Sequence, residues 1–572
     1  MNTLIDSIRA SVIGAGVPIT TAFGEKPLIY ADYTASGRAL TFIEDYIRDQ
    51  VLPYYANTHT ETSFTGAQTM AFREQARQEV RRAVNGRSED KVIFCGPGAT
   101  AAINKLIDIL GMRLPRDLAT KYDLESAIPA NERPVVFVGP YEHHSNELPW
   151  RESIADVVCI PLTAEGQICQ DELTQKLQQF ADRPLKIGSF SAASNVTGIK
   201  SDVTGITGLL KSHGALAFWD YAAAAPYVAI NMNGATPIDA VFVSPHKFIG
   251  GPGTPGILIA KQSIMNNSVP AIVGGGTVVY VTPEDHRYVD NAERREEGGT
   301  PAIVESIRAG MVFKLQQEVS TDEIERREAV FVERAIKAFK QCPNLDILGN
   351  PEAPRLSIMS LRFNHAGKAL HYGFVVALLN DLFGIQVRGG CSCAGPYGHA
   401  LLDMDMTYSR AVEAEITQGN AVLRPGWVRL NFNYFIADAE FDYLVEAIKL
   451  VAEQGWRMLP FYHFDTNAGT WRYEKRKQPA SHNLSGLNFT AYCNQPRQAE
   501  VGCSEDYTES LSDYLALARK TLHNTCPDTG TSVLVLSEKA EALRWFVLPQ
   551  DVQATHKKAT NSAAVVSHSV TS

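Results

Sequence analysis

Residues 239–253 read DAVFVSPHKFIGGPG, and this stretch determines how the rest of the chain is interpreted. Asp239–Ser244 is a short run of apolar, mostly β-branched and aromatic residues, which is typical of a strand covered on both faces. Lys247 follows that strand and precedes a glycine-rich loop. A lysine amine can condense with an aldehyde when partial desolvation disfavours its charge. The stretch therefore predicts a reactive lysine at the carboxyl end of a strand.

Short apolar runs of this kind alternate with amphipathic stretches through the first two-thirds of the chain. The strand candidates are Lys91–Cys95, Pro134–Val138, Asp156–Ile160, Leu185–Phe190, Ala215–Trp219, Asp239–Ser244 and Gly256–Ala260. The helix candidates are Ala67–Val84, Gly98–Leu110, Asp171–Phe180 and Asp202–Ser212. This alternation predicts an α/β fold with a large, mainly parallel sheet. Ligands of such sheets collect at the loops after the carboxyl ends of the strands.

The pattern changes from about Pro301 onward. Helix candidates Val304–Gln317, Thr321–Lys340, Ala369–Phe383 and Ala439–Gln454, with strand candidates Arg355–Phe363 and Trp427–Phe432, predict a smaller α+β domain. Beyond it lie one amphipathic helix candidate, Glu505–His523, and two strand-like pieces, Ser532–Leu536 and Leu543–Leu548. We therefore divide the chain into an N-terminal segment (1–24), a large domain (25–320), a small domain (321–460), a C-terminal extension of unknown role (461–552) and a disordered tail (553–572).

The composition argues against several classes of protein. The 572 residues include 53 basic and 63 acidic side chains, a formal charge of −10, whereas general nucleic-acid binders and binders of anionic membranes carry a basic excess. Nine scattered cysteines are too few for a disulfide framework and indicate a reducing compartment. We find neither a leader-like start nor an apolar run of membrane-spanning length. We expect a cytoplasmic protein that binds neither nucleic acid nor membrane.

Other polar residues stand at comparable strand ends. Asp220 directly follows the strand candidate Ala215–Trp219, where a carboxylate could keep a pyridine nitrogen protonated. Residues 96–101 (GPGATA) open a helix, and the N–H groups at a helix N-terminus are suited to bind phosphate. Ser244 and His246, beside Lys247, could donate hydrogen bonds to the same phosphate.

These motifs together resemble the class V aminotransferases, and the cysteine desulfurases in particular. The resemblance rests on residues 245–247 (PHK), Asp220 and residues 142–146 (EHHSN), and it extends from about Leu28 to Glu453. Each motif is weak alone, whereas their order and their positions at strand ends are specific. The resemblance implies a fold type I transferase that depends on pyridoxal 5'-phosphate (PLP) and acts as a homodimer.

The resemblance also implies cofactor-binding roles for individual residues. Lys247 matches the Schiff-base lysine, Asp220 the partner of the pyridine nitrogen, and His143 the imidazole stacked on the ring. Ala222 would pack under the ring, and Asn195 would donate to the phenolic oxygen. The phosphate-side positions are Thr100, Ala99, Ser244, His246 and, on a loop that reaches the phosphate of the partner subunit, Thr300. Two positions depart from the family: Ala99 stands where threonine is common, and Ala223 replaces a Gln or His, which could weaken PLP binding or alter reaction preference.

On the substrate side, the resemblance implies that Arg429 clamps the substrate carboxylate with its bidentate fork. Arg388 is a second candidate for substrate binding. Asn57 and His59 lie where the family has substrate-side residues.

A cysteine-containing loop is the second informative stretch. Residues 388–396 read RGGCSCAGP, in which the glycines permit movement and the nearby arginine favours a thiolate. The loop resembles that of cysteine desulfurases and of the desulfurase domain of molybdenum-cofactor sulfurases, and alignment from Arg388 gives Cys393 the persulfide-bearing position. A metal site is not predicted here, because only His399 lies near Cys391 and Cys393 and zinc needs four ligands at recognisable spacing.

The predicted activity is conversion of L-cysteine to L-alanine. Lys247 would move the α-proton, and the Cys393 thiolate would attack the substrate sulfur and pass it, as a persulfide, to an acceptor such as a protein. One alternative is another class V enzyme, such as a C–S lyase, a selenocysteine lyase or an aminotransferase, in which Cys393 is inert. The other is a non-catalytic scaffold that binds a partner through its C-terminal extension.

Overall fold

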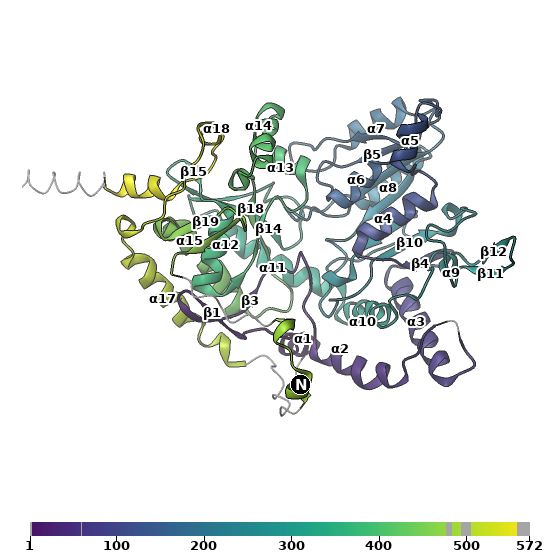
Figure 1. Cartoon of the computed structure of the whole chain (residues 1–572), viewed down its shortest axis with the longest axis horizontal. Helices are drawn as coiled ribbons and strands as arrows, with labels where there is room; N and C mark the ends of the chain where they lie inside the picture. The colour runs from purple at the N-terminus through teal and green to yellow at the C-terminus, as the bar shows by residue number, and fades with distance from the viewer. Residues whose placement is uncertain (1–2, 59, 476–482, 494–504, 558–572) are drawn as a thin grey trace, which may run out of the picture.

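The computed structural model describes residues 3–58, 60–475, 483–493 and 505–557. These residues form two lobes that lie side by side (Figure 1). The large lobe is built on a seven-stranded sheet, and the small lobe is built on an antiparallel sheet that forms later in the chain. No helix in the described ranges is both long and apolar enough to cross a membrane.

The large sheet has the strand order β4-β10-β9-β8-β7-β5-β6. Its strands are β4 (Asp90–Phe94), β5 (Val135–Val138), β6 (Asp156–Cys159), β7 (Lys186–Ser191), β8 (Leu216–Asp220), β9 (Ala240–Val243) and β10 (Ile257–Lys261). The pairs from β6 through β9 are parallel, and β10 runs antiparallel to both of its neighbours. The predicted α/β fold with a mainly parallel sheet is confirmed, and each of the seven strands predicted for this sheet has bounds within two residues of an observed strand.

Burial on both faces explains why these strands read as continuous apolar runs. The side chains of β5 (VVFV) and β9 (AVFV) are fully buried or nearly so. One face packs against α4 (Gly98–Ile109), through residues such as Phe218 and Phe242. The other face packs against α8 (Val203–Ser212), where the Trp219 indole donates to Thr207 Oγ1 at 2.9 Å. Full burial of one such large apolar side chain contributes about 1.5–3 kcal/mol to folding.

The small lobe contains a sheet of order β13-β14-β18-β17 covered by helices. Its elements are β13 (Leu345–Ile347), β14 (Ile358–His365), β17 (Arg388–Gly390), β18 (Trp427–Asn431), α11 (Thr321–Phe339), α12 (Tyr372–Phe383) and α15 (Asp438–Gln454). The sequence predicted β14 and β18 but assigned residues 388–390 to the cysteine-containing loop. They form an edge strand instead, in which Arg388 pairs with Arg429 across the ladder.

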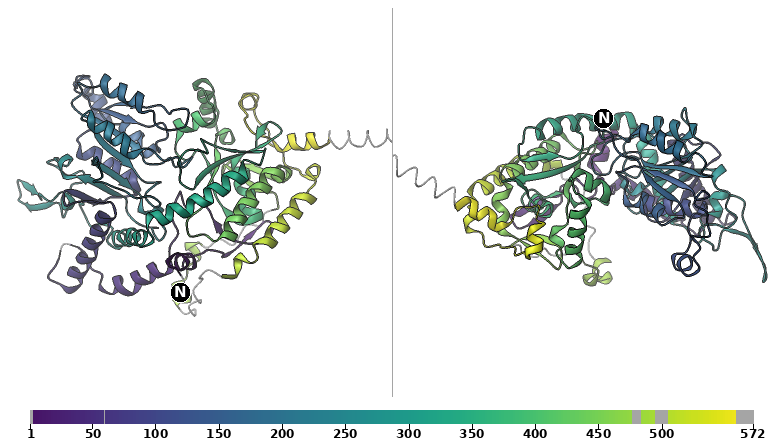
Figure 2. Two further views of the ribbon diagram at one scale, coloured as in Figure 1. Left: turned by 180° about the vertical axis from the view of Figure 1, so that it is seen from behind. Right: turned by 90° about the horizontal axis from the view of Figure 1, so that it is seen from above.

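The C-terminal extension packs on the outer side of the small lobe, away from the large lobe (Figures 1 and 2). A hairpin, β19 (Tyr462–Asp465) with β20 (Thr470–Tyr473), and α17 (Leu511–Asn524) contact α12. His371, which precedes α12, accepts a 3.0 Å hydrogen bond from the Trp471 indole and stacks on Trp545. The extension therefore shares a core with the small lobe.

Three predictions for the extension and the tail that follows it are wrong. Ser532–Leu536 has no strand partner among the described residues; Val533 and Val535 point to solvent, and Leu534 is held by the Gln550 side chain. Leu543–Leu548 forms a single bridge, Phe546 with Ala369, because its aromatic side chains pack around His371 instead of forming a ladder.

The third correction concerns the tail predicted to be disordered from residue 553. A helix over residues 549–557 enters that segment, because Val552 is buried and the Gln553 side chain donates to Gly530 O at 2.6 Å. The rest of the predicted tail, 558–572, lies outside the described residues. The other boundaries between segments stay predictions.

Candidate active site

A cavity of about 470 Å³ lies where the strand ends of the two lobes face each other. It is lined by most of the candidates from the sequence: Lys247, Asp220, His143, Asn195, Thr100, Ala99, Ala222, Ser244, His246, Arg388, Arg429 and Cys393. The large lobe supplies the cofactor-side residues and the small lobe supplies the arginines and the thiol. The topology therefore brings together groups that are separated by up to 330 residues in the chain, from Ala99 to Arg429.

Lys247 ends a short 3-10 helix (Pro245–Lys247) directly after β9. Burial lowers the pKa of its amine to about 8, and the neighbouring Asp220 carboxylate opposes part of this shift. A large fraction of this amine is therefore neutral near pH 8, whereas an ordinary lysine is almost fully charged there. A neutral, desolvated amine is the form that attacks an aldehyde.

Asp220 is the last residue of β8 and is 4% exposed. Its Oδ1 accepts a 2.8 Å hydrogen bond from Ala222 N, which fixes the carboxylate above the turn that follows the strand. Burial raises the pKa of this carboxyl group, while the Ala222 N–H and Lys247 act in the opposite direction. A buried carboxylate in this position has reason to take a cationic partner, such as a protonated pyridine nitrogen.

His143 is held in one orientation by Ser145. Its Nδ1 accepts from Ser145 N at 3.1 Å and lies 3.0 Å from Ser145 Oγ. Burial, together with the charge of Lys247, lowers the pKa of His143 to about 4. The ring is therefore neutral at pH 7, and we assign its proton to Nε2 because Nδ1 is an acceptor.

Ser145 also connects His143 to the phosphate side, since its Oγ lies 2.6 Å from Thr100 Oγ1. Ser145 lies within the motif of residues 142–146, but the sequence predicts no role for it. The sequence does place a hydroxyl residue two positions after His143. At that spacing a side chain can form a local hydrogen bond, and this pattern could have indicated the contact.

The N-terminus of α4 forms a tight cradle beside Lys247. Gly98 has φ +57°, and a Cβ at Gly256 would collide with Gly98 O, so both positions require glycine. Ala99 N donates to Ser244 Oγ at 2.8 Å. The Ala99 methyl packs into the core under the loop, which explains how alanine is accommodated at this departure from the family pattern.

Asp32 joins the two arginines of the site, and sequence reasoning missed it. Its carboxylate lies 3.0 Å from Arg388 Nε and 3.3 Å from Arg429 Nη2. The N-terminal strand β3 (Ile29–Tyr30) positions Asp32 by pairing in parallel with β16 (Ile385–Gln386), just before β17. The three charged groups carry a net charge of +1, which suits an anionic substrate group.

The two cysteines of the loop differ in their surroundings. Cys393 is exposed and lines the cavity, whereas Cys391 is partly buried against the core of the small lobe and is absent from the described residues that line the cavity. Ser392 and Cys393 both have left-handed backbone angles, with φ +56° and +55°. The geometry therefore distinguishes Cys393 from Cys391 as the thiol that can meet a ligand in the cavity.

Two predicted site residues do not reach this cavity, and a third cannot be placed relative to it. Thr300 and Asn57 are exposed and are not among its lining residues, and His59 lies outside the described residues. Thr300 was expected to serve the partner subunit, so its position outside this chain's own cavity leaves that expectation open.

The cavity chemistry fits PLP. It offers a desolvated amine, a buried carboxylate and a helix N-terminus. It also contains Thr34 Oγ1 and Arg429 Nε, two buried polar atoms with no hydrogen-bond partner among the described residues. Buried polar atoms are almost always satisfied, so these two indicate a polar ligand.

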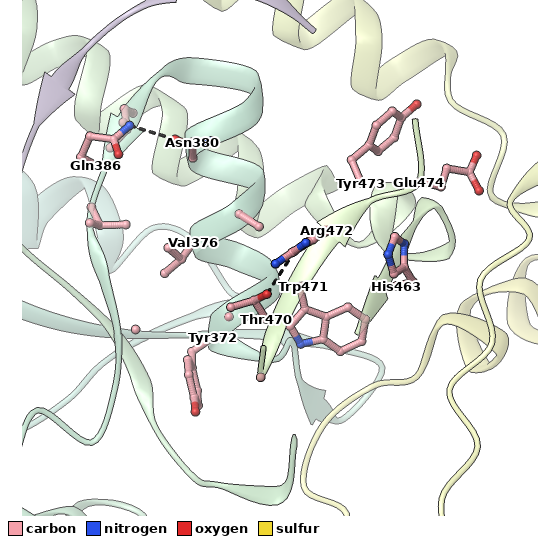
Figure 3. Close-up of a pocket in the computed structure, with 16 residues that line it drawn as sticks. Tyr372, Val376, Asn380, Gln386, His463, Thr470, Trp471, Arg472, Tyr473 and Glu474 are labelled. Atoms are coloured by element: carbon pink, nitrogen blue, oxygen red, sulfur yellow. Dashed lines mark hydrogen bonds between the residues drawn. The ribbon is translucent and has the colours of Figure 1, made fainter. Parts of the chain in front are cut away.

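A larger cavity, of about 790 Å³, lies between α12 and the β19–β20 hairpin (Figure 3). Tyr372 and Val376 face it from the helix, and Thr470, Trp471 and Arg472 face it from the hairpin. None of the described residues that line it is a lysine or a cysteine. The chemistry predicted from the sequence therefore belongs to the smaller cavity.

Comparisons with known proteins agree with this geometry. The sequence profile of the family described as Aminotransferase class-V matches residues 29–411. A probable cysteine desulfurase of Staphylococcus epidermidis is 28% identical over 377 residues, which cover 65% of this chain and 84% of that protein. A probable cysteine desulfurase of Halalkalibacterium halodurans is 26% identical over 374 residues, which cover 65% of this chain and 85% of that protein.

Solved structures of cysteine desulfurases share the fold. The apo structure from Thermococcus onnurineus NA1 superimposes with a TM-score of 0.60 at 21% identity, covering 74% of this chain and 95% of that one. The cysteine desulfurase CsdA from Escherichia coli, in an S-sulfonic acid form, gives 0.59 at 21% identity, covering 74% and 94%.

Proposed function

Because the chain belongs to the class V aminotransferase family, a family of PLP-dependent enzymes, we propose that it is a cysteine desulfurase. It would convert L-cysteine to L-alanine and collect the sulfur as a persulfide on Cys393. The observation that carries this proposal is the exposed Cys393 thiol, which lines the same cavity as Lys247 and Arg429. The names of the similar proteins support it. Release of alanine from L-cysteine, and its dependence on Cys393, is the direct test.

Different residues of the site would carry out different steps of this reaction. Arg429 and Arg388, held by Asp32, would bind the substrate carboxylate with charge-assisted hydrogen bonds. Bound PLP would supply an electron sink for the substrate α-carbon. Lys247, neutral in part near pH 8, would take the α-proton from the substrate and later return a proton to the α-carbon.

Cys393 would then complete the sulfur transfer. Its thiolate would attack the substrate sulfur, so that an S–S bond forms and the carbon–sulfur bond breaks. The electron pair of that bond stays with the β-carbon, which takes one proton to become the methyl group of alanine. His143, neutral and with its proton on Nε2, is a candidate donor of that proton. The products balance as L-alanine and an enzyme persulfide.

The pKa of Lys247 predicts how PLP uptake depends on pH. Only the neutral amine condenses with the aldehyde, and its population rises with pH through a pKa of about 8. After the cofactor has been stripped, we expect the rate of PLP uptake to rise about tenfold from pH 7 to pH 9 and then level off. The growth of visible absorbance measures this rate, with Lys247→Ala as the blank. A rise of about a hundredfold with no levelling would indicate an ordinary lysine and would contradict the prediction.

We also propose that the enzyme is a homodimer. Large apolar side chains are exposed on one segment: Val269, Ile272, Val273, Val279, Tyr280 and Val281. The Thr300 loop lies against this segment, because Gly299 N donates to Gly275 O at 2.8 Å. Several exposed apolar side chains on one segment favour a protein interface, and a second copy docked there would receive Thr300 near its own cavity.

Charge introduced on this surface tests the dimer. We expect Tyr280→Asp to convert the dimer to a monomer, measured by light scattering after size-exclusion chromatography, because a buried unpaired carboxylate destabilises an interface. Val535→Asp is the matched control, since Val535 is 83% exposed in the C-terminal extension. A Tyr280→Asp protein that keeps the wild-type mass, or a wild type that is already monomeric, would contradict the proposal.

We also propose a sulfur acceptor and a cellular location for the enzyme. A protein acceptor would take the sulfur from the exposed Cys393, and a cytoplasmic location would keep free thiols reduced.

A further inference from the structure

The loop that carries Cys393 has a conformation that its own residues do not favour. Ser392 and Cys393 occupy the left-handed region in succession, where a side chain crowds the following carbonyl group. Non-glycine residues persist in this region only where contacts with the surroundings hold them. The contacts around residues 391–395, which we call the thiol loop, therefore decide where the thiol lies.

Three hydrogen bonds from the large lobe hold the thiol loop. His144 Nε2 accepts from Gly395 N at 2.9 Å, and His144 N donates to Cys393 O at 2.8 Å. Asn195 Nδ2 donates to Ser392 O at 2.8 Å. Gly395 opens the helix α13 (Gly395–Leu401), so its N–H is one of the donors that a helix leaves without an internal partner. His144 supplies that partner from the other lobe.

The residues that hold the loop are themselves fixed. The segment of His144 is anchored by Glu142, a buried carboxylate that accepts from Ser191 N at 3.0 Å and from Asn146 Nδ2 at 2.7 Å. The side chains of the two histidines contact different parts of the site. His143 faces the cavity, and the side chain of His144 meets the thiol loop. One short rigid segment therefore orients both an imidazole of the site and the thiol.

We propose that His144 is a positioning residue that holds Cys393 toward the cavity, and that Asn195 links this hold to cofactor binding. An amide carries two N–H donors, so Asn195 can bond Ser392 O with one and serve the phenolic oxygen of PLP with the other. Binding of PLP then fixes the amide and steadies the thiol loop. The role of the loop in sulfur transfer rests on the proposed function, whereas its hold by His144 does not.

Two variants of His144 separate the effect of its hydrogen-bond acceptor from the effect of its ring shape. His144→Phe keeps a flat ring without an acceptor, and His144→Gln keeps an acceptor at similar reach. Hydrogen exchange at the Gly395 amide and alkylation of Cys393 by iodoacetamide, followed by mass spectrometry of its peptide, are read on the full chain without turnover. We expect both rates to rise about three- to tenfold in His144→Phe, as for loss of one hydrogen bond, and to stay near the wild type in His144→Gln.

Each measurement has a result that would overturn part of the proposal. Wild-type rates in His144→Phe, or an equal rise in both variants, would overturn the role of the acceptor. Saturating PLP should slow exchange in residues 391–395 of the wild type, and an unchanged rate would overturn the link through Asn195. If the protein releases alanine from L-cysteine, His144→Phe should lower kcat and leave KM for L-cysteine unchanged, because the arginines are untouched. If it releases none, the exchange result still tests the hold, so the two failures are distinguishable.

Discussion

Lys247→Ala is expected to lose the visible absorbance of bound PLP and at least about a thousandfold in the turnover of L-cysteine, which corresponds to about 4 kcal/mol of activation free energy. The physical reason is that the Lys247 amine is both the group that condenses with the aldehyde and the base for the α-proton. Burial gives this amine a pKa of about 8, and no second lysine among the described residues that line the cavity could replace it. Absorbance spectra and an alanine assay measure the two effects.

Lys247→Arg is the matched control for charge and volume. A guanidinium keeps the positive charge beside Asp220 but does not condense with an aldehyde. We therefore expect the arginine variant to fold like the wild type, to bind PLP more weakly and to be as inactive as the alanine variant. Two results together would favour the non-catalytic scaffold. The visible spectrum of the wild type would not shift when an amino acid is added, and the Lys247→Ala variant would show the same spectrum as the wild type.

The second large effect is expected in Cys393→Ala, which should release alanine from L-cysteine at least about a thousandfold more slowly than the wild type. The thiolate is the only sulfur nucleophile that the described lining residues offer, and without it the substrate sulfur has no acceptor in the cavity. PLP binding should be unchanged, because the thiol lies on the small-lobe side of the cavity. The spectrum of the variant therefore checks that the cofactor site is intact.

Cys391→Ala is the matched control for this prediction. Cys391 is two residues away but is packed against the small-lobe core, so its loss should leave alanine release within a few-fold of the wild type. Equal activity in Cys393→Ala and the wild type would move the protein to the C–S lyases, selenocysteine lyases or aminotransferases. If the wild type releases no alanine from L-cysteine, other amino acids become the substrates to test.

Most of the large lobe could be predicted from the sequence because its strands are buried on both faces. A strand such as Ala240–Val243 leaves a continuous apolar signature, and the polar residue after it is then identified by position alone. Lys247 and Asp220 stand out for this reason. The arrangement of the sheet follows from the same rule, since parallel strands bring their carboxyl ends to one edge.

The rest of the site could not be found in this way because it depends on contacts between distant segments. Asp32 acquires its role only when β3 pairs with β16, some 350 residues further along the chain by their numbers. Ser145 is an ordinary polar residue until its backbone and hydroxyl meet His143 Nδ1. The β17 strand contains two glycines and no apolar alternation, so its pairing with β18 left no local signal.

The strands predicted in the extension are absent from the described residues for a related reason. Its segment 543–548 has the composition of a strand, but Trp545 and Phe546 pack against His371, and the Trp545 indole donates to Leu423 O at 2.9 Å. Aromatic residues occur both in paired β-strands and in packed aromatic clusters. Which of the two forms is decided by the small lobe that they cover.

The exposure of Cys393 carries a chemical liability. A thiol that solvent can reach is also open to peroxide. Its first oxidation product, the sulfenic acid, is reversible with another thiol, whereas the sulfinic and sulfonic acids are in general not. Cys393 belongs to none of the three hydrophobic clusters of the described residues, so such damage would leave both sheets folded. Oxidative stress would thus silence the proposed sulfur transfer while a well-folded protein, still able to hold its cofactor, persisted in the cell.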